Sequence, residues 1–202
     1  MAHRIREAML TDDNTPMGGG GGAVEADETF FGRDPEAKPS KMAIRNMNKI
    51  VTLLDRSTGQ TRSIVVKDIN LSSIAAILNA NLSPNANLVT DEANHYKTPG
   101  KAFASHKSVN HAQKEYVSKE DRTITTNQIE GFFGIFKRGM RGVYQHCGSQ
   151  HLSRYLTEFD FRYTNREAFG INDEDRTNTA IKGAVGKRLV YRRADGLKAA
   201  QA

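Results

Sequence analysis

The chain has 202 residues, of which 38% are hydrophobic, and these numbers allow one substantial core and favour a single domain. No apolar stretch approaches the roughly 18 residues of a membrane span, and the N-terminal MAHRIREAML lacks the apolar run of a secretory signal, so we expect a cytoplasmic protein without a membrane segment. The single cysteine, Cys147, excludes an internal disulfide framework and a thiolate zinc site.

The net charge is +6 and the sequence pI is near 9.5. Almost all of the positive excess lies from residue 130 onward, whereas residues 1–129 are close to neutral. A basic half suits an enzyme that handles a polyanion, because phosphates attract positive charge. A solubilising surface explains the charge equally well, so charge alone does not identify a partner.

The chain begins with a predicted short basic helix over residues 3–10, and a glycine-rich stretch that is typical of a flexible connector follows it. Residues 24–31 are rich in β-formers and predict a strand. Period-two alternation places Glu25 and Asp27 on one face of that strand. Asp27 is therefore expected on a strand rather than in a loop.

Residues 32–47 contain two prolines and mixed charge, which indicates an exposed excursion. The apolar runs 49–55 and 62–67 predict a hairpin with Gly59 in its turn. The elements expected next are a helix over 71–82, a strand over 87–91 that ends at Asp91, and a further strand over 109–117.

The best-defined helix begins at Asn127, which is expected to cap it. Glu130 and Lys137 are almost two turns apart, so their side chains project in nearly the same direction about 10 Å from each other. The pattern Asn127-x-x-Glu130 is also a capping box, in which Glu130 only satisfies a backbone amide, and this alternative stays open. Another face of the helix carries the apolar spacing of a buried stripe: Ile129, Phe132, Phe133, Phe136 and Met140.

A second helix is predicted over residues 150–165. Three strands, a helix, a strand and a helix-rich end predict an α/β fold, a ribonuclease-H-like mixed sheet flanked by helices. We divide the chain into an N-terminal helix and linker (1–22), a catalytic domain (23–170) and a basic C-terminal tail (171–202). The tail segment GKRLVYRR suits a phosphate backbone, although such segments are often only solvated.

Three acidic residues, Asp27, Asp91 and Glu130, each lie where a regular element would direct a carboxylate at a shared point. Carboxylates within a few ångström repel each other, and a divalent cation is the usual reason for assembling them. Oxygen-rich sites hold Mg²⁺ or Mn²⁺, and two such ions about 4 Å apart can activate an attacking oxygen and stabilise a leaving one. If the three acids converge, the sequence predicts phosphodiester chemistry.

The sequence contains, in order, the blocks VEADETFFG, VTDEANHY, KSVNHAQKEYV, TNQIEGFFGIFKRG, HLSRYLTEFDFRYTNR and GKRLVYRR. Together these blocks resemble bacterial insertion-sequence transposases of the DDE class. The resemblance implies an integrase core of the ribonuclease-H type in which Asp27, Asp91 and Glu130 bind two magnesium ions. It also matches Lys137 to a basic position of the family. Relatives vary at the third acidic position, so Asn127 is an alternative third ligand.

The implied reaction is hydrolysis of a phosphodiester at a transposon end, followed by attack of the freed 3′ hydroxyl on target DNA. Lys137, Arg138 and Arg141 are expected to neutralise DNA phosphates. A homodimer is implied, because two ends must be joined. Family members usually carry an N-terminal DNA-binding module, and this chain resembles a form without one. Its alternative functions are therefore a truncated, non-catalytic DNA-binding remnant and a generic nuclease.

The histidines give weaker signals. His95 lies four residues beyond Asp91 and is a candidate for orienting water or DNA near the ions, with a surface or supporting role as the alternative. His111 belongs to one of the resembling blocks, but the residues around it suggest only a hydrogen bond in the sheet. Cys147 is interpreted as a bystander.

Overall fold

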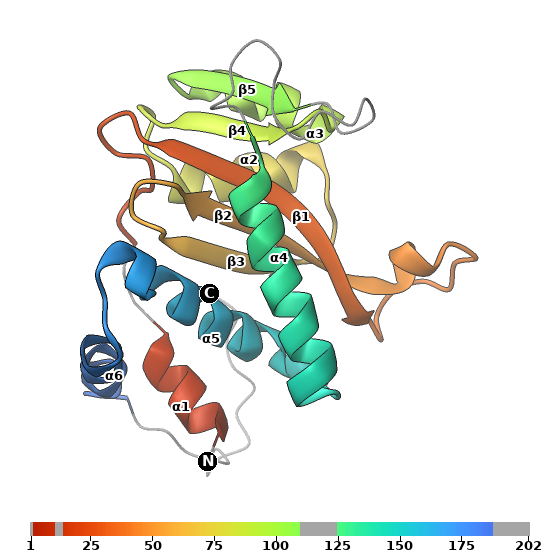
Figure 1. The fold of residues 1–202 in the computed structure, drawn as a ribbon. Helices are drawn as coiled ribbons and strands as arrows, with labels where there is room; N and C mark the ends of the chain where they lie inside the picture. The colour runs from red at the N-terminus through yellow and green to blue at the C-terminus, as the bar shows by residue number, and fades with distance from the viewer. Residues whose placement is uncertain (1, 11–13, 110–124, 188–202) are drawn as a thin grey trace.

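The structure is a computed structural model of the chain, and it describes residues 2–10, 14–109 and 125–187. Its centre is a five-stranded mixed sheet in which β1, β2 and β3 are antiparallel neighbours and β4 and β5 run parallel to β1. The strand order is β3-β2-β1-β4-β5 (Figure 1). The strands are β1 (Ala23–Arg33), β2 (Met47–Asp55), β3 (Thr61–Val66), β4 (Asn87–Asp91) and β5 (Ser105–Val109). This topology confirms the predicted ribonuclease-H-like sheet.

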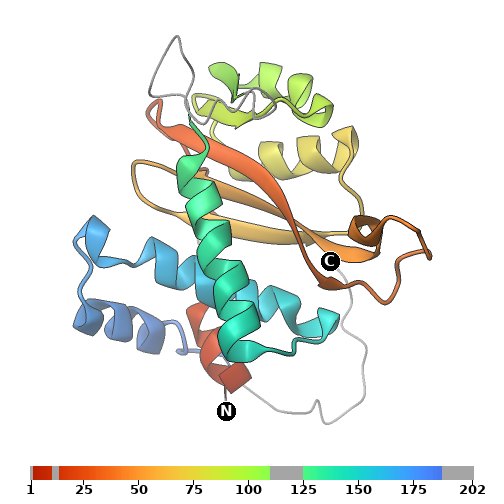
Figure 2. The same ribbon diagram turned by 45° about the vertical axis from the view of Figure 1, so that its right-hand side comes forward.

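Helices cover both faces of the sheet. Helix α4 lies across one face, and α2 and α3 lie on the other, while α1, α5 and α6 gather beyond the β3 edge (Figures 1 and 2). The helices are α1 (Ala2–Met9), α2 (Leu71–Asn81), α3 (Asn94–Lys97), α4 (Asn127–Gly139), α5 (Leu152–Thr164) and α6 (Asp173–Lys182). Among the described helices, none combines the length and the apolar character that a membrane crossing demands.

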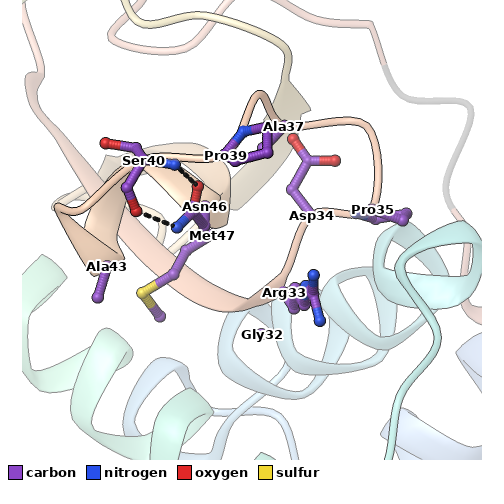
Figure 3. Close-up of a pocket in the computed structure, with 10 residues that line it drawn as sticks. All are labelled: Gly32, Arg33, Asp34, Pro35, Ala37, Pro39, Ser40, Ala43, Asn46 and Met47. Atoms are coloured by element: carbon purple, nitrogen blue, oxygen red, sulfur yellow. Dashed lines mark hydrogen bonds between the residues drawn. The ribbon is translucent and has the colours of Figure 1, made fainter.

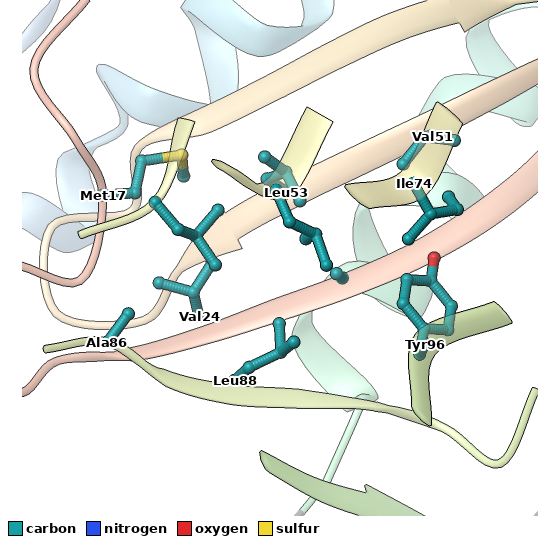
Figure 4. Packing of buried hydrophobic residues seen from close by; sticks show 11 residues of the cluster. Met17, Val24, Val51, Leu53, Ile74, Ala86, Leu88 and Tyr96 are labelled. Atoms are coloured by element: carbon teal, nitrogen blue, oxygen red, sulfur yellow. The ribbon is translucent and has the colours of Figure 1, made fainter. Parts of the chain in front are cut away.

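Strand β1 separates two hydrophobic cores because its side chains alternate. Val24 and Ala26 pack with residues of α2 and α3 in the first core, together with Leu53, Leu88 and Tyr96 (Figure 4). Glu25 pairs with Leu54 of β2, and both side chains lie on the other face of the sheet. There the second core joins β2 to α4 and α5: Ile50, Leu54, Ile129, Phe132, Phe136, Leu152 and Leu156. The alternation predicted for residues 24–31 is therefore confirmed.

The predicted apolar stripe of α4 is also confirmed, since each of its five residues is buried. The rings of this helix pack against other aromatic residues: Phe136 lies edge-on to Phe31 and to Phe159, with ring centroids 5.3 Å apart in each pair. The phenylalanines therefore belong to the core of the protein.

The residues before β1 do not form the free connector that their glycine content predicts. The side chain of Met17 is 1% exposed, and its backbone N–H donates to the carbonyl of Asn81 at 2.8 Å. The backbone N–H of Gly18 donates to Asp55 Oδ2 at 2.8 Å, with a φ of 73° that favours glycine. Because Met17 fills a site in the first core, the chain is held in place before the first strand begins.

Two expectations fall partly outside the described residues. Strand β5 (Ser105–Val109) pairs with β4, and of the strand expected over 109–117 only Val109 lies in the described part, since residues 110–124 lie outside it. The expected C-terminal tail contains helix α6, where Asn172 Oδ1 accepts the backbone N–H of Asp175 as an N-cap. The stretch 188–202 of that tail also lies outside the described part.

Helix α5 closes the edge of the sheet. The edge strand β3 directs backbone N–H groups at this helix, where Asp160 Oδ2 accepts from Ser63 at 2.8 Å and Thr164 Oγ1 accepts from Thr61 at 3.1 Å. Asp160 Oδ1 also accepts the Ser63 hydroxyl at 2.7 Å. The unpaired edge that would otherwise be open to another strand is therefore occupied by side chains.

Replacing Asp160 with asparagine tests this contact through pH. Burial raises the pKa of Asp160 to about 7, above its ordinary value near 3.8. The hydrogen bonds from Ser63 act in the opposite direction and lower this pKa. The contribution of Asp160 to the free energy of unfolding is therefore fully present below about pH 4, and it is lost as the pH rises to about 7. We expect Asp160→Asn to melt above the wild type at pH 8 and the difference to shrink at pH 5, measured by circular dichroism. The same difference at both pH values would contradict this assignment.

Candidate active site

Asp27 and Asp91 lie on adjacent strands. The parallel pairing of β1 with β4 places Glu25 opposite Val89. That pair is the last one in the ladder, and Asp27 and Asp91 each follow it by two residues along their own strand. Their side chains project from the face that α4 covers. The prediction that two strands deliver these carboxylates is consistent with this register.

Helix α4 begins beside the same part of β1. The backbone N–H of Ile129, in the first turn of the helix, donates to Glu25 Oε2 at 2.8 Å. Glu25 precedes Asp27 by two residues on the same face of the strand, and Glu130 follows Ile129. A hydrogen bond between residues 104 positions apart in the chain therefore attaches the start of α4, which carries Glu130, to β1.

Asp27 has the electrostatic surroundings of a buried acid with other acids nearby. Burial raises the pKa of Asp27 to about 8, and a hydrogen bond from the Glu28 backbone N–H opposes this rise. The negative charges of Glu28, Asp91 and Glu130 raise the pKa further. A deprotonated Asp27 is consequently unfavourable unless positive charge is supplied nearby.

Each of the three carboxylates also has a local hydrogen-bond partner. Asp27 Oδ1 accepts the next backbone N–H at 2.7 Å, and Asp91 Oδ1 accepts the N–H two residues on at 3.0 Å. Glu130 Oε1 accepts the hydroxyl of Thr126 at 3.1 Å. Among the described residues, no three His, Cys, Asp or Glu side chains stand as a group that could hold a metal ion. The acids share one region, and their side chains are turned toward neighbours.

The capping role expected for Asn127 is wrong. The N-cap of α4 is Thr126, and Asn127 is the first residue of the helix with an exposed side chain. Glu130 is therefore one position too far along to complete a capping box. The physical reason is that the carboxylate of Glu25 already accepts an N–H of the first turn, so the sequence pattern around Asn127 is not used.

The basic residues lie toward the other end of α4. The helix is continuous from Asn127 to Gly139, which places Lys137 about 10 Å along the axis from Glu130. The Lys137 ammonium lies 6.0 Å from the centroid of the Phe133 ring. Arg138 is exposed on the same helix, and Arg141 is exposed in the π-helical turn Met140–Tyr144 that follows. These cations therefore follow Glu130 toward the C-terminal end of α4 and the turn after it.

His95 lies on the opposite side of β1 from the three acids. Its Nε2 atom is 3.0 Å from Glu28 Oε1, an ion-pair distance without hydrogen-bond geometry. Tyr96 donates its hydroxyl hydrogen to Glu28 Oε2 at 2.8 Å. Because side chains alternate along the strand, Glu28 and Asp27 lie on opposite faces of β1. The contact with Tyr96 therefore stabilises β1 on the face opposite to Asp27. His111 lies outside the described residues.

Sequence reasoning assigned no role to Glu25 and Arg56. Glu25 is fully buried, and its Oε1 atom accepts from Arg56 Nε at 2.7 Å. Burial raises the pKa of Glu25, and the N–H of Ile129 and the charge of Arg56 lower it. The available signal was a second acid two residues before Asp27 on the same strand face, opposite the apolar Leu54.

A pocket lies away from the acids, in the excursion that follows β1. The predicted excursion runs from Gly32 to Met47 and encloses a pocket, stabilised by a pair of hydrogen bonds between Ser40 and Asn46 (Figure 3). None of the three acids lines it. The acidic region and this pocket are therefore separate features.

Comparison with known proteins identifies the family. A family model of the ISXO2-like transposase domain matches residues 20–164, well over half of the chain. No curated protein matches the chain by sequence. Similar solved structures include the integrase catalytic core domain of HTLV-2 in complex with magnesium, whose dimeric form is 11% identical with a TM-score of 0.45 and covers 73% of this chain and 87% of that chain. Its trimeric form is 12% identical with a TM-score of 0.45 and covers 83% and 99%.

A third similar structure is the simian T-cell lymphotropic virus intasome in complex with the PP2A regulatory subunit B56 gamma, at 10% identity and a TM-score of 0.45. It covers 95% of this chain and 63% of that chain. The family match and the observed sheet topology agree with each other. The chain belongs to the ISXO2-like transposase domain family, and its ribonuclease-H-like sheet is that of a DDE-class transposase catalytic domain.

Proposed function

We propose that this chain is a DDE transposase that cleaves phosphodiester bonds at transposon ends and transfers the freed strands into target DNA. In this proposal Asp27, Asp91 and Glu130 hold two Mg²⁺ or Mn²⁺ ions. The observation that supports it most is the position of Asp27, on a strand that pairs with the strand of Asp91, with a pKa that burial and the charges of Glu28, Asp91 and Glu130 raise. The proposal concerns the reaction and the residues that perform it.

The donor set fits the proposed ions. Carboxylate oxygens are the ligands that Mg²⁺ and Mn²⁺ prefer, and nearby negative charges make a deprotonated Asp27 unfavourable without a cation. Two ions bound there would supply activation of the attacking oxygen and stabilisation of the leaving oxygen. The chain itself contributes position: β1 and β4 fix two ligands, and the first turn of α4 brings the third.

DNA is the proposed partner, and a second copy of the chain is the proposed assembly partner. Lys137, Arg138 and Arg141 follow Glu130 along one helix and its terminal turn, so a DNA strand with its reactive phosphate at the acids would pass these cations. Joining two transposon ends requires two active sites, which a homodimer supplies. Under this proposal, the alternatives of a DNA-binding remnant and a generic nuclease become outcomes of the tests that follow.

Thermal stability without DNA tests Asp27 directly. The folded-state pKa of about 8 exceeds the ordinary 3.8, so without divalent ions the stability linked to Asp27 falls as the pH rises from about 4 to about 8. We expect Asp27→Asn to melt above the wild type at pH 8 in EDTA, with a smaller difference at pH 5. Mn²⁺ should raise the melting temperature of the wild type and leave the variant unchanged. An equal response to Mn²⁺ in both proteins argues against Asp27 as a ligand.

Cleavage of a transposon-end duplex in Mg²⁺ or Mn²⁺ tests the catalytic assignment. We expect Asp27→Ala, Asp91→Ala and Glu130→Gln to lower the cleavage rate by about a thousandfold or more while DNA binding persists, because these residues act through positioning and charge. Asn127→Ala is the matched control on the same helical turn and should cleave at nearly the wild-type rate.

The reaction products separate the candidate functions. Joined products in addition to cleaved ones support a transposase, and cleaved products alone support a generic nuclease. If the wild type binds DNA and shows no metal-dependent cleavage, the non-catalytic remnant is correct. If Asn127→Ala loses as much activity as Glu130→Gln, then Asn127 takes part in the site.

The salt dependence of DNA binding tests the basic residues. Each phosphate contact contributes about 0.9 to the slope of log K against log salt concentration, so alanine at Lys137, Arg138 or Arg141 should lower that slope by about this amount. Arg162→Ala is a suitable control, since this arginine on α5 is 60% exposed and lies outside α4. A flat salt response in the wild type, or equal slopes in all variants, would remove the phosphate-contact assignment.

A further inference from the structure

The first turn of α4 is capped from another element. The first backbone N–H groups of a helix have no acceptor within the helix and need one from outside. In α4 the side chain of the N-cap residue Thr126 does not cap the helix and donates instead to Glu130. The acceptor for the N–H of Ile129 is the carboxylate of Glu25 on β1. The start of the helix is thus attached to the strand that carries Asp27.

This contact is one half of a buried ion pair. Glu25 is 0% exposed, and its other carboxylate oxygen accepts from Arg56 Nε at 2.7 Å. The guanidinium of Arg56 also donates from Nη2 to the carbonyl of Thr125, just before the helix. Buried carboxylates are unfavourable unless they are paired and hydrogen-bonded, so Glu25 keeps both partners in place. The pair therefore holds two successive parts of the chain against β1.

The same pair sets the spacing between proposed metal ligands. Glu25 and Asp27 are two residues apart on one strand face, about 6 to 7 Å. Ile129, which Glu25 holds, directly precedes Glu130. One carboxylate consequently fixes the strand-borne acid relative to the helix-borne acid, although more than a hundred residues separate them in the sequence.

We propose that Glu25 and Arg56 are positioning residues for the metal site, which keep Glu130 within reach of the ions held by Asp27 and Asp91. This inference rests on the proposed function and adds to it two residues that touch neither ion nor DNA. An ion pair that served only the fold would affect thermal stability and leave metal affinity unchanged in a folded variant. Metal affinity therefore separates the two roles.

The test compares a buried carboxylate, Glu25, with a half-buried one, Asp160, that has a similar structural role in another place. Glu25 and Asp160 each accept a backbone N–H from another element, but Asp160 joins α5 to β3, on the far side of β2 from Asp27. We expect Glu25→Gln to weaken Mn²⁺ binding about tenfold, the lower end of what loss of a supporting residue around a metal does. Asp160→Asn should bind Mn²⁺ as the wild type does.

Mn²⁺ binding is measured on the full chain from the electron paramagnetic resonance signal of the free ion, and the Mn²⁺ concentration for half-maximal end cleavage gives a second reading. The cleavage midpoint should rise by about the same factor in Glu25→Gln, and saturating Mn²⁺ should restore most of the rate. Arg56→Lys keeps the positive charge but loses the planar fork that reaches both Glu25 and Thr125, so it should shift both readings in the same direction.

Arg56→Lys decides the question if Glu25→Gln fails to fold by circular dichroism. Wild-type Mn²⁺ affinity in the folded variants, or an equal loss of affinity in Asp160→Asn, overturns the positioning role. A wild type that neither binds Mn²⁺ nor cleaves DNA overturns the proposed function instead. The two failures are therefore distinguishable.

Discussion

A buried carboxylate, Glu25, connects the sheet to the helix on which the candidate site depends. Pairing between β1 and β4 places the strands of Asp27 and Asp91 next to each other, and the ladder ends two residues before both aspartates. The position of Glu130 has no such ladder. It depends on the apolar stripe of α4, which holds the helix on the second core, and on the bond from Ile129 to Glu25, which fixes where along β1 the helix begins. Packing sets the distance of the helix from the sheet, and Glu25 sets its position along the strand.

The two faces of the sheet differ in the polarity of the residues that β1 contributes to them. On the α2 side, β1 contributes Val24 and Ala26, and the packing is almost entirely apolar (Figure 4). On the α4 side, β1 contributes Glu25 and Asp27, placed close to the apolar residues of the second core. That proximity removes water from the carboxylates and raises the pKa of both. Arg56 offsets the charge of Glu25, whereas the side chains that act most on the pKa of Asp27 are acidic: Glu28, Asp91 and Glu130.

The sequence predicts those features that a short window of residues determines. Alternation in residues 24–31 places Asp27 on the correct face, and the 3.6-residue period of α4 identifies its buried stripe. The turn at Gly59 follows from glycine between two apolar runs, and its φ of 71° agrees. Burial in each case depends on neighbours in the same element, and hydrophobic periodicity reports that directly.

Features that depend on contacts between distant segments could not be predicted in this way. Asn127 matched the local pattern of a cap, but the acceptor came from Glu25 on a strand far away in the sequence. From the sequence, Met17 is interpreted as part of a connector. Its position in the first core depends on contacts with Asn81 and Leu82 at the end of α2, which a local pattern does not reveal. A short strand such as β5, with the sequence SHKSV, has little apolar alternation and is defined by its pairing with β4.

The local hydrogen bonds of the three acids bear on how such a site would operate. Asp27 and Asp91 lie on the paired strands β1 and β4, and Glu130 lies in the first turn of α4, which a hydrogen bond attaches to β1. For the carboxylates to turn toward a shared ion, each side chain would rotate away from one N–H or hydroxyl donor. These donors lie close to the surface or within the same turn as the acid. Side-chain rotation is a small and fast change compared with movement of a helix. In the proposed metal site, the carboxylates would therefore reach an ion first by rotation of their side chains.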